Sequence, residues 1–488
     1  MKGAIPVVGN DRATTENTES PQGPLRRSLV LLIMTVGYFL VLLDVTIINV
    51  TLPSIRVALG AEVSELQWIV DGYAVALASI LLTGGTFGDL YGHKRVVLTG
   101  LSVFGLASLA CGLAPTSDAL IGARIAQGMG AAVLLPGTLA IITGTYGKER
   151  AAQGWAISIW AAVGSLALPA GPLLGGLLVE TVGWRSVFIV NLPIVGLAIV
   201  ASVLAVQENN RASSQKLDSL GLGLATVLLA TLTFAFIEGG SVGWISAPVL
   251  AASACAVIAF VAFILVESRS QSPMLPLEFF RTWEFTGANA VAGLMNLVAL
   301  GTIFLLTLYL QVVQGHSALV AGAETVPMFV PLSMLSPISG RLAARFGPRL
   351  PMTAGLALGI LGMVLLRRLE ADSGYLLQLF PPMVCIGACL GLLTPAVVAA
   401  AMGSVPASRS GLASGANNTA RQAAGAIGVA LFGALAGTPN AVGSFLEGLH
   451  TAALLGAGLW VGGIVLTLTL SGRPKPVCMR YERTPIER

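Results

Sequence analysis

The sequence predicts an all-α membrane protein with fourteen transmembrane helices, and three observations lead to this fold class. Of the 488 residues, 55% are hydrophobic and only 10% are charged, whereas about a quarter of the residues of a soluble protein are charged. The mean hydropathy is +0.84. Fourteen stretches reach the length of about 20 mostly apolar residues that a spanning helix requires. The chain is therefore expected to be solvated by lipid.

The predicted spans form groups of six, two and six. The first six cover residues 28–53, 66–88, 96–114, 119–145, 152–180 and 185–206; the next two cover 217–238 and 247–267; the last six cover 284–313, 318–343, 350–368, 375–402, 410–437 and 450–471. We therefore expect a disordered cytoplasmic tail (1–27), an N-terminal six-helix bundle (28–206), two additional transmembrane helices with linkers (207–283), a C-terminal six-helix bundle (284–471) and a cytoplasmic tail (472–488).

The basic residues predict the orientation. If both tails are cytoplasmic, most of the 27 Lys and Arg residues fall on the cytoplasmic side, as the positive-inside rule requires. Residues 1–27 also lack the apolar centre and cleavage site of a secretory signal. Arg outnumbers Lys, and Ala and Gly are abundant, which is typical of a GC-rich bacterial genome. We expect a multi-pass protein of the bacterial inner membrane with both termini in the cytoplasm.

The sequence predicts no catalytic residues, no metal site and no cofactor. The number of Cys residues, five, is odd, and four of them lie in apolar stretches, where free Cys behaves as a small buried apolar residue. His93, His316 and His450 are scattered, and no His-Glu-x-x-His motif occurs. A membrane-embedded enzyme is therefore a weak alternative, and the dispersed basic residues do not predict a nucleic-acid partner.

An internal repeat indicates two related bundles. Residues 85–95 follow the second span and read Gly-Thr-Phe-Gly-Asp-Leu-Tyr-Gly-His-Lys-Arg; residues 340–349 follow the tenth and read Gly-Arg-Leu-Ala-Ala-Arg-Phe-Gly-Pro-Arg. A basic, Gly-rich loop can arise once by chance, but two in register indicate related halves. Such halves enclose a central cavity, and alternating access follows when they rock against each other.

At these residues the chain resembles the major facilitator superfamily, from about Arg27 to Leu470. The family's loop signature maps onto Gly85, Phe87, Gly88, Asp89, Gly92, Lys94 and Arg95. Leu90 and His93 replace its usual basic residues. The resemblance implies the major facilitator fold, with two six-helix bundles and here two additional central helices. It also implies that the Asp and its cations form a cytoplasmic gating loop that holds the bundles together in one state; a simple topology anchor is the alternative.

The fifth predicted span resembles the family's antiporter signature. Its Gly-Pro-x-x-Gly-Gly core is present at Gly171, Pro172, Gly175 and Gly176, while Ala167 replaces a Gly of the longer version. In the family, this motif marks exporters that exchange a substrate for protons. Glycines permit close helix contact and Pro bends a helix; ordinary tight packing in the membrane is the alternative explanation.

Residues 43–53 and 184–193 match patterns of the fourteen-helix drug:proton antiporters within this family. The resemblance implies proton-driven export of a small organic molecule, either antibiotic or multidrug efflux or self-resistance of an antibiotic producer. A proton symporter for uptake and a non-transporting sensor are the alternatives. We expect the partners to be the substrate, protons and the lipid bilayer, and the chain to be a monomer.

Ionised side chains within spans are the candidates for proton coupling, because burying a charge in a membrane is costly. Asp44 matches the family's intramembrane Asp and ranks first, followed by Glu324 and Asp71. Arg124 lies in the family's Arg-x-x-Gln-Gly motif, and its positive charge can favour release of a proton from a nearby carboxyl group; a purely structural pairing is the alternative. Arg421 is expected near the cytoplasmic end of its helix, in a structural role.

Overall fold

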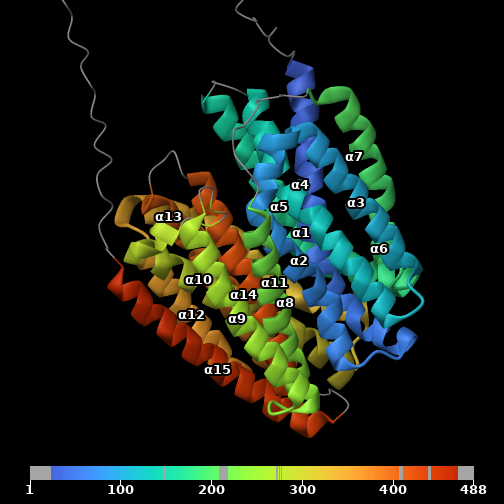
Figure 1. Ribbon diagram of the computed structural model, residues 1–488. Helices are drawn as coiled ribbons and strands as arrows, with labels where there is room; N and C mark the ends of the chain where they lie inside the picture. The colour runs from blue at the N-terminus through green and yellow to red at the C-terminus, as the bar shows by residue number, and fades with distance from the viewer. Residues whose placement is uncertain are drawn as a thin grey trace, which may run out of the picture.

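The computed structural model describes residues 24–146, 150–207, 218–270, 273, 275, 277–405, 410–437 and 441–470. Every regular element in this part is a helix (Figure 1). The first nine α-helices are α1 (Pro24–Leu59), α2 (Val63–Tyr91), α3 (His93–Leu113), α4 (Ser117–Tyr146), α5 (Arg150–Thr181), α6 (Ser186–Ile189), α7 (Asn191–Ala205), α8 (Ser219–Val242) and α9 (Ala247–Arg269). They are followed by η1 (Leu277–Arg281), α10 (Trp283–Leu308), η2 (Tyr309–Val313), α11 (Ala318–Phe346), α12 (Arg349–Leu366), η3 (Tyr375–Leu379), α13 (Phe380–Gly403), α14 (Ser410–Ala436) and α15 (Val442–Thr469).

The length and composition of these helices confirm the predicted fold class, an all-α membrane protein. Thirteen helical segments of the described residues are long and apolar enough to cross a membrane. A further helix of sufficient length is α2, which has 29 residues and carries Glu65, Gln67 and Asp71 in its first half. The predicted sixth span is divided into α6 and α7, because Pro193 has no amide hydrogen to donate to the preceding turn.

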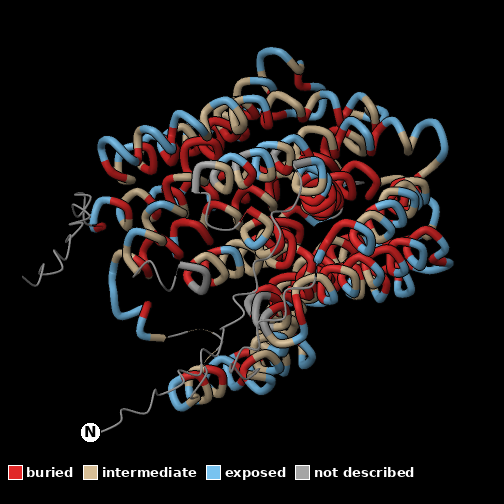
Figure 2. The backbone as a smooth tube through the Cα atoms, turned by 90° about the horizontal axis from the view of Figure 1, so that it is seen from above, coloured by how far each residue is buried: buried red, intermediate tan, exposed pale blue. Residues whose placement is uncertain are grey.

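The helices pack as two groups. Helices α1–α7 pack with one another, and so do α10–α15, while α8 packs on α9, α2 and α14. Figure 2 shows that buried residues line the inward faces of the helices and exposed residues lie on the outside, the distribution expected when exposed apolar side chains contact lipid. The predicted domain boundaries stay a prediction; most of the 1–27 tail and all of the 472–488 tail lie outside the described residues.

The two repeat loops form the same turn. Gly92 ends α2 with φ 93°, and Gly347 ends α11 with φ 85°. Each donates its backbone N–H to a carbonyl one turn earlier, that of Gly88 at 2.9 Å and that of Ala343 at 3.0 Å. Glycine is required at such positions because a side chain disfavours positive φ. The repeat read in the sequence is thus also a repeat of backbone geometry.

The two bundles meet at one end of the molecule. We call the end at which α1 begins and α15 ends the tail side, and the opposite end the far side. In the described part, α5 packs on α11 and α2 packs on α14, and the hydrogen bonds between the bundles lie toward the far side. In Figure 1 the bundles converge toward this side and diverge toward the tail side. The structure therefore describes a state closed on the far side.

Candidate transport pathway between the bundles

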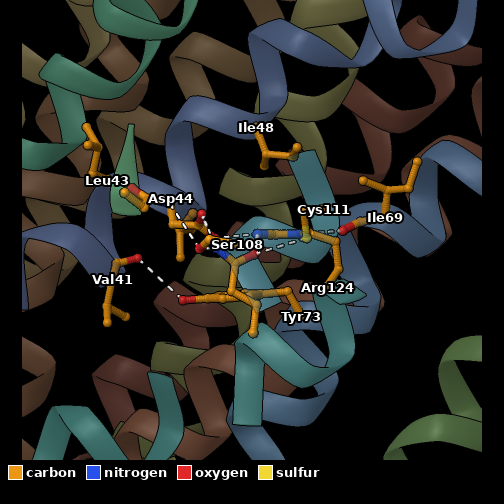
Figure 3. A network of polar contacts seen from close by, with 12 residues as sticks. Val41, Leu43, Asp44, Ile48, Ile69, Tyr73, Ser108, Cys111 and Arg124 are labelled. Carbon is orange, nitrogen blue, oxygen red and sulfur yellow. Dashed lines mark hydrogen bonds and ion pairs between the residues drawn. The ribbon is translucent and has the colours of Figure 1, made fainter. Parts of the chain in front are cut away.

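A buried ion pair joins α1 to α4. Asp44 and Arg124 are each 1% exposed, and Arg124 Nη1 contacts Asp44 Oδ2 (Figure 3). Gln127 completes the pair: its Oε1 accepts from Arg124 Nη1 at 2.7 Å, and its Nε2 donates to Asp44 Oδ1 at 2.8 Å. Arg124 and Gln127 can both reach Asp44 because residues three apart lie on one face of a helix.

Further contacts fix the Arg124 side chain. Its Nε donates to the backbone carbonyl of Ile69 at 3.0 Å, and its guanidinium lies 4.3 Å from the centre of the Tyr73 ring. The network continues from Gln127 to the Ser108 hydroxyl at 2.9 Å. Arg124 is therefore satisfied by a carboxylate, an amide, a carbonyl and an aromatic face, which is how proteins stabilise a buried charge.

Asp71 presents the opposite situation. It is fully buried on α2, and neither of its carboxylate oxygens has a hydrogen-bond partner among the described residues. Asp71 and Arg124 line the same cavity between the bundles. An unpartnered buried carboxylate is costly unless it binds a proton or a counter-ion. Asp71 is therefore the carboxyl group of this site that needs one of the two.

Two cavities lie between the bundles. The first encloses about 450 Å³ of space, including its open side, and is lined by Val45, Asn49, Val70, Asp71, Tyr73, Ala74, Leu77, Arg124, Leu300, Gln422, Gly425, Ala426 and Val429. The second encloses about 360 Å³ and is lined by Thr46, Asn49, Val50, Pro172, Ile303, Leu306, Thr307, Thr325, Met328, Phe329 and Met383. Asn49 borders both. Mostly apolar walls with a few polar groups are typical of small-molecule sites.

The antiporter motif packs α5 against two different helices. A Cβ atom on Gly175 would lie 2.6 Å from Val50 of α1, and one on Gly176 would lie 2.6 Å from the Ala318 carbonyl oxygen of α11. Gly171 likewise faces Thr46 and Ile47 of α1, and Pro172 lines a cavity. Gly171 and Gly175 thus let α5 pack closely on α1 of its own bundle, and Gly176 lets α5 pack closely on α11 of the other bundle.

Gln67 closes the far side on the α2–α14 seam. It is 2% exposed, and its Nε2 donates to the backbone carbonyls of Val429 at 3.3 Å and Ala430 at 3.0 Å. On the other seam, Glu180 accepts from the backbone N–H of Leu319 at 2.9 Å. These bonds connect the two bundles, so they must break when the far side opens.

We expect the substitution Gln67→Leu to reduce transport several-fold without unfolding the protein. The change removes two hydrogen bonds, each worth about 1 kcal/mol, from the far-side-closed state alone. Transport into membrane vesicles gives the measurement. Gln153→Leu is the matched control, because Gln153 donates to Thr143 within one bundle at 3.1 Å; an equal loss in both variants would contradict a role of Gln67 in the seal.

Glu324 lies apart from the ion pair and is not among the residues that line either cavity. It is 14% exposed and accepts or shares a hydrogen bond with His316 Nδ1 at 2.8 Å on the far side. The structure therefore brings Asp44, Asp71 and Arg124 together and leaves Glu324 with a separate partner. Its role in proton coupling stays a prediction.

The predicted gating loop is described only in part. Gly85 and Asp89 belong to the last turns of α2, and the Asp89 side chain lies outside the described part of the structure. Gly92 forms the turn between α2 and α3, and Lys94 Nζ donates to the backbone carbonyl of Val203 at 2.8 Å. Lys94 thus binds near the end of α7 in its own bundle, where a cation is favoured by the helix dipole. Arg95 lies at the start of α3, and the gating role of the loop stays a prediction.

Sequence reasoning missed Gln127 and Gln67 and placed Arg421 wrongly. Gln127 stands three residues after Arg124, and this spacing was the available signal; Gln67 depends on a contact with the other bundle, which no local pattern reveals. Arg421 does not lie at the tail-side end of its helix. It lies about three turns into α14, which begins at Ser410.

Known proteins match the chain over most of its length. The sequence profile of the Major Facilitator Superfamily matches residues 34–429. Multidrug resistance protein Stp of Mycobacterium tuberculosis (strain CDC 1551 / Oshkosh) is 36% identical over 414 residues, which is 84% of this chain and 76% of that protein. Methylenomycin A resistance protein of Bacillus subtilis (strain 168) is 34% identical over 407 residues, which is 83% of this chain and 87% of that protein.

Solved structures agree at the level of the fold. A crystal structure of the peptide transporter POT in complex with sulfate has a TM-score of 0.65 at 17% identity and covers 91% of this chain and 96% of its own. A bacterial homologue of the human lysosomal transporter Spinster, inward-facing and unoccupied, has a TM-score of 0.64 at 17% identity, with coverages of 91% and 97%. The major facilitator fold predicted from the sequence is confirmed. The chain is a multi-pass bacterial membrane transporter, not an enzyme, and it belongs to the Major Facilitator Superfamily.

Proposed function

We propose that this transporter exports an antibiotic or another small drug from the bacterial cytoplasm in exchange for protons, and that it acts as a monomer in the inner membrane. Relatives that share about a third of its residues are named as multidrug and antibiotic resistance proteins, which supports efflux. The excess of Lys and Arg in the loops on the tail side supports a cytoplasmic location of that side.

Alternating access supplies the transport step of this proposal. With the tail side in the cytoplasm, the state described is closed toward the outside, and the substrate enters the cavities from the cell interior. Rocking the bundles separates Gln67 from α14 and Glu180 from α11, which opens the far side. In this proposal each bundle moves as a rigid group, because its helices pack extensively on one another.

The unpartnered Asp71 beside the Asp44–Arg124 pair is the observation that carries the proton coupling. Arg124 is paired with Asp44, and Asp71, which has no hydrogen-bond partner among the described residues, lines the same cavity as Arg124. A proton on Asp71 removes the need for a counter-ion there. Release of that proton to the cytoplasm leaves a negative charge that attracts Arg124 or a cationic group, so proton occupancy changes the electrostatics of the cavity.

We expect Asp71→Asn to abolish export driven by a pH gradient while exchange of substrate across the membrane persists, because an amide cannot carry a proton. The first step is accumulation of ethidium and a panel of antibiotics in efflux-deficient cells, with and without a protonophore. The extruded compound is then followed in proteoliposomes that contain the wild type or the variant, with external and internal pH set independently.

Asp118→Asn is the matched control, because Asp118 is an exposed Asp in the first turn of α4. It should retain gradient-driven export. Gradient-driven export by Asp71→Asn would refute the role of Asp71. Increased uptake of the compound by the wild type would refute export itself and favour a symporter on the same fold.

A further inference from the structure

Arg421 is a second cation of the helix interior, half-buried where Arg124 is almost fully buried, and its surroundings differ from those of Arg124. Its Nε donates to Asn296 Oδ1 of α10 at 3.4 Å. Among the described residues, no acceptor contacts its two terminal amino groups, and no carboxylate pairs with it. Arg124, in contrast, has a carboxylate, an amide and a carbonyl as partners. A guanidinium presents five N–H donors, so most of the donors of Arg421 are unused.

Arg421 lies four residues before Gly425, on the same face of α14, and Gly425 lines the cavity between the bundles. Tyr38 of α1, in the N-terminal bundle, is near enough for its hydroxyl to be influenced by the Arg421 charge. Tyr38 is itself fixed: it stacks on Trp160 of α5 with ring centres 3.8 Å apart and an interplanar angle of 18°, and Gly164 gives it room, since a Cβ there would overlap the Tyr38 ring. The indole N–H of Trp160 has no acceptor in the described part.

The position of Arg421 connects this cluster to the pathway. The next residue, Gln422, and Gly425 one turn further along α14 both line the cavity that contains Asp71 and Arg124. Arg421 lies on the tail side of these residues along α14, and the far side is closed by Gln67. A molecule that enters from the tail side therefore reaches Arg421 before it reaches Asp71.

We propose that Arg421, with Tyr38 and Asn296, binds an anionic oxygen group of the transported molecule, such as a carboxylate. This inference rests on the proposed function, because Arg421 lies next to the cavity assigned to export, on its tail side, and not among the residues that line it. A planar guanidinium matches two oxygen atoms of a carboxylate, the Tyr38 hydroxyl can donate a further hydrogen bond, and the Tyr38–Trp160 pair offers an apolar wall to the rest of the molecule. The substrate class is thus a small, partly apolar organic acid.

The test compares probes that differ only in charge. The full-length protein in lipid nanodiscs is titrated with 2-naphthoate, 2-naphthamide and 2-naphthylmethylammonium near neutral pH by calorimetry, with empty nanodiscs subtracted. We expect the wild type to bind 2-naphthoate at least about tenfold more tightly than the amide, as one charge-assisted bidentate contact provides. Arg421→Gln should abolish this preference, Arg421→Lys should retain part of it, and Tyr38→Phe should weaken it.

Arg345→Gln is the matched control, because it removes an Arg that packs on Phe346 near the tail-side end of α11; it should leave the preference unchanged. Equal binding of acid and amide by the wild type would overturn the inference even if Arg421→Gln did not fold, and so would a preference that survives in Arg421→Gln. The titration needs no proton gradient, so it can succeed even if the proposed proton coupling is refuted. Conversely, if the protein exports a compound but shows no preference for the acid over the amide, only the Arg421 site is refuted.

Discussion

Replacing Asp44 by Ala is expected to abolish transport and to destabilise the protein by about 3–5 kcal/mol, because breaking one half of a buried ion pair leaves the other charge uncompensated. Asp44 and Arg124 are both almost fully buried, and no second carboxylate contacts Arg124 in the described part. Transport by vesicles and thermal unfolding of the purified protein give the two measurements, and both should fall together.

A double variant separates the structural role of the pair from its role in transport. Asp44→Asn combined with Arg124→Gln removes both charges and keeps groups of similar size, so folding should be largely restored. Transport should stay absent if proton binding depends on the Arg124 charge. Gradient-driven export by the double variant would show that the pair serves only the fold, and a stable, inactive Asp44→Ala variant would contradict the predicted destabilisation.

Gly176→Ala is expected to reduce transport by about tenfold, because it shifts the equilibrium between the far-side-closed and the far-side-open states. The new Cβ would lie 2.6 Å from the Ala318 carbonyl oxygen and 2.8 Å from the Leu319 nitrogen, both backbone atoms of the opposite bundle. Overpacking of this kind costs about 1–3 kcal/mol. The penalty applies only while α5 and α11 are in contact, so it favours opening of the far side and disfavours loading from the tail side.

Gly196→Ala supplies the matched control, because it is the same chemical change on α7 at a position where a Cβ would meet nothing within 4 Å. For the measurement, the native cysteines are removed and a single cysteine replaces Val50, which lines a cavity. A membrane-impermeant maleimide added on the far side then labels this cysteine only when the far side is open. Labelling should rise in Gly176→Ala and not in Gly196→Ala. Unchanged labelling with reduced transport would contradict the seal and indicate a defect within the N-terminal bundle.

Most of the helices could be predicted from the sequence. A spanning helix leaves a long apolar run bounded by polar residues. The observed helices coincide with the predicted spans except at their ends: α2 extends three residues beyond its prediction on each side, and α15 begins at Val442 instead of residue 450. The paired turns at Gly92 and Gly347 could also be predicted from the sequence, because a glycine directly after a helix commonly adopts a positive φ.

The candidate site could be predicted only where its residues belong to one bundle. Asp44 and Arg124 each stand out as a charge in an apolar run, and the structure shows them as partners. Three other features depend on which residues of the other bundle lie opposite. These are the missing partner of Asp71, the hydrogen bonds of Gln67 and the free donors of Arg421. Such contacts join residues several hundred positions apart, and no local spacing encodes them.

The two additional helices make the molecule unequal on its two flanks. Helix α8 packs on both α2 and α14, with Gly240 against Ala434 and Trp68 near Phe234 at 6.4 Å between ring centres, and α9 packs on α8 from the other side. In the described part of the chain, no additional helix packs on both α5 and α11 in this way. The surface that the chain presents to the bilayer is therefore asymmetric: the α2–α14 seam lies behind α8, whereas the α5–α11 seam is closed only by the direct packing of those two helices.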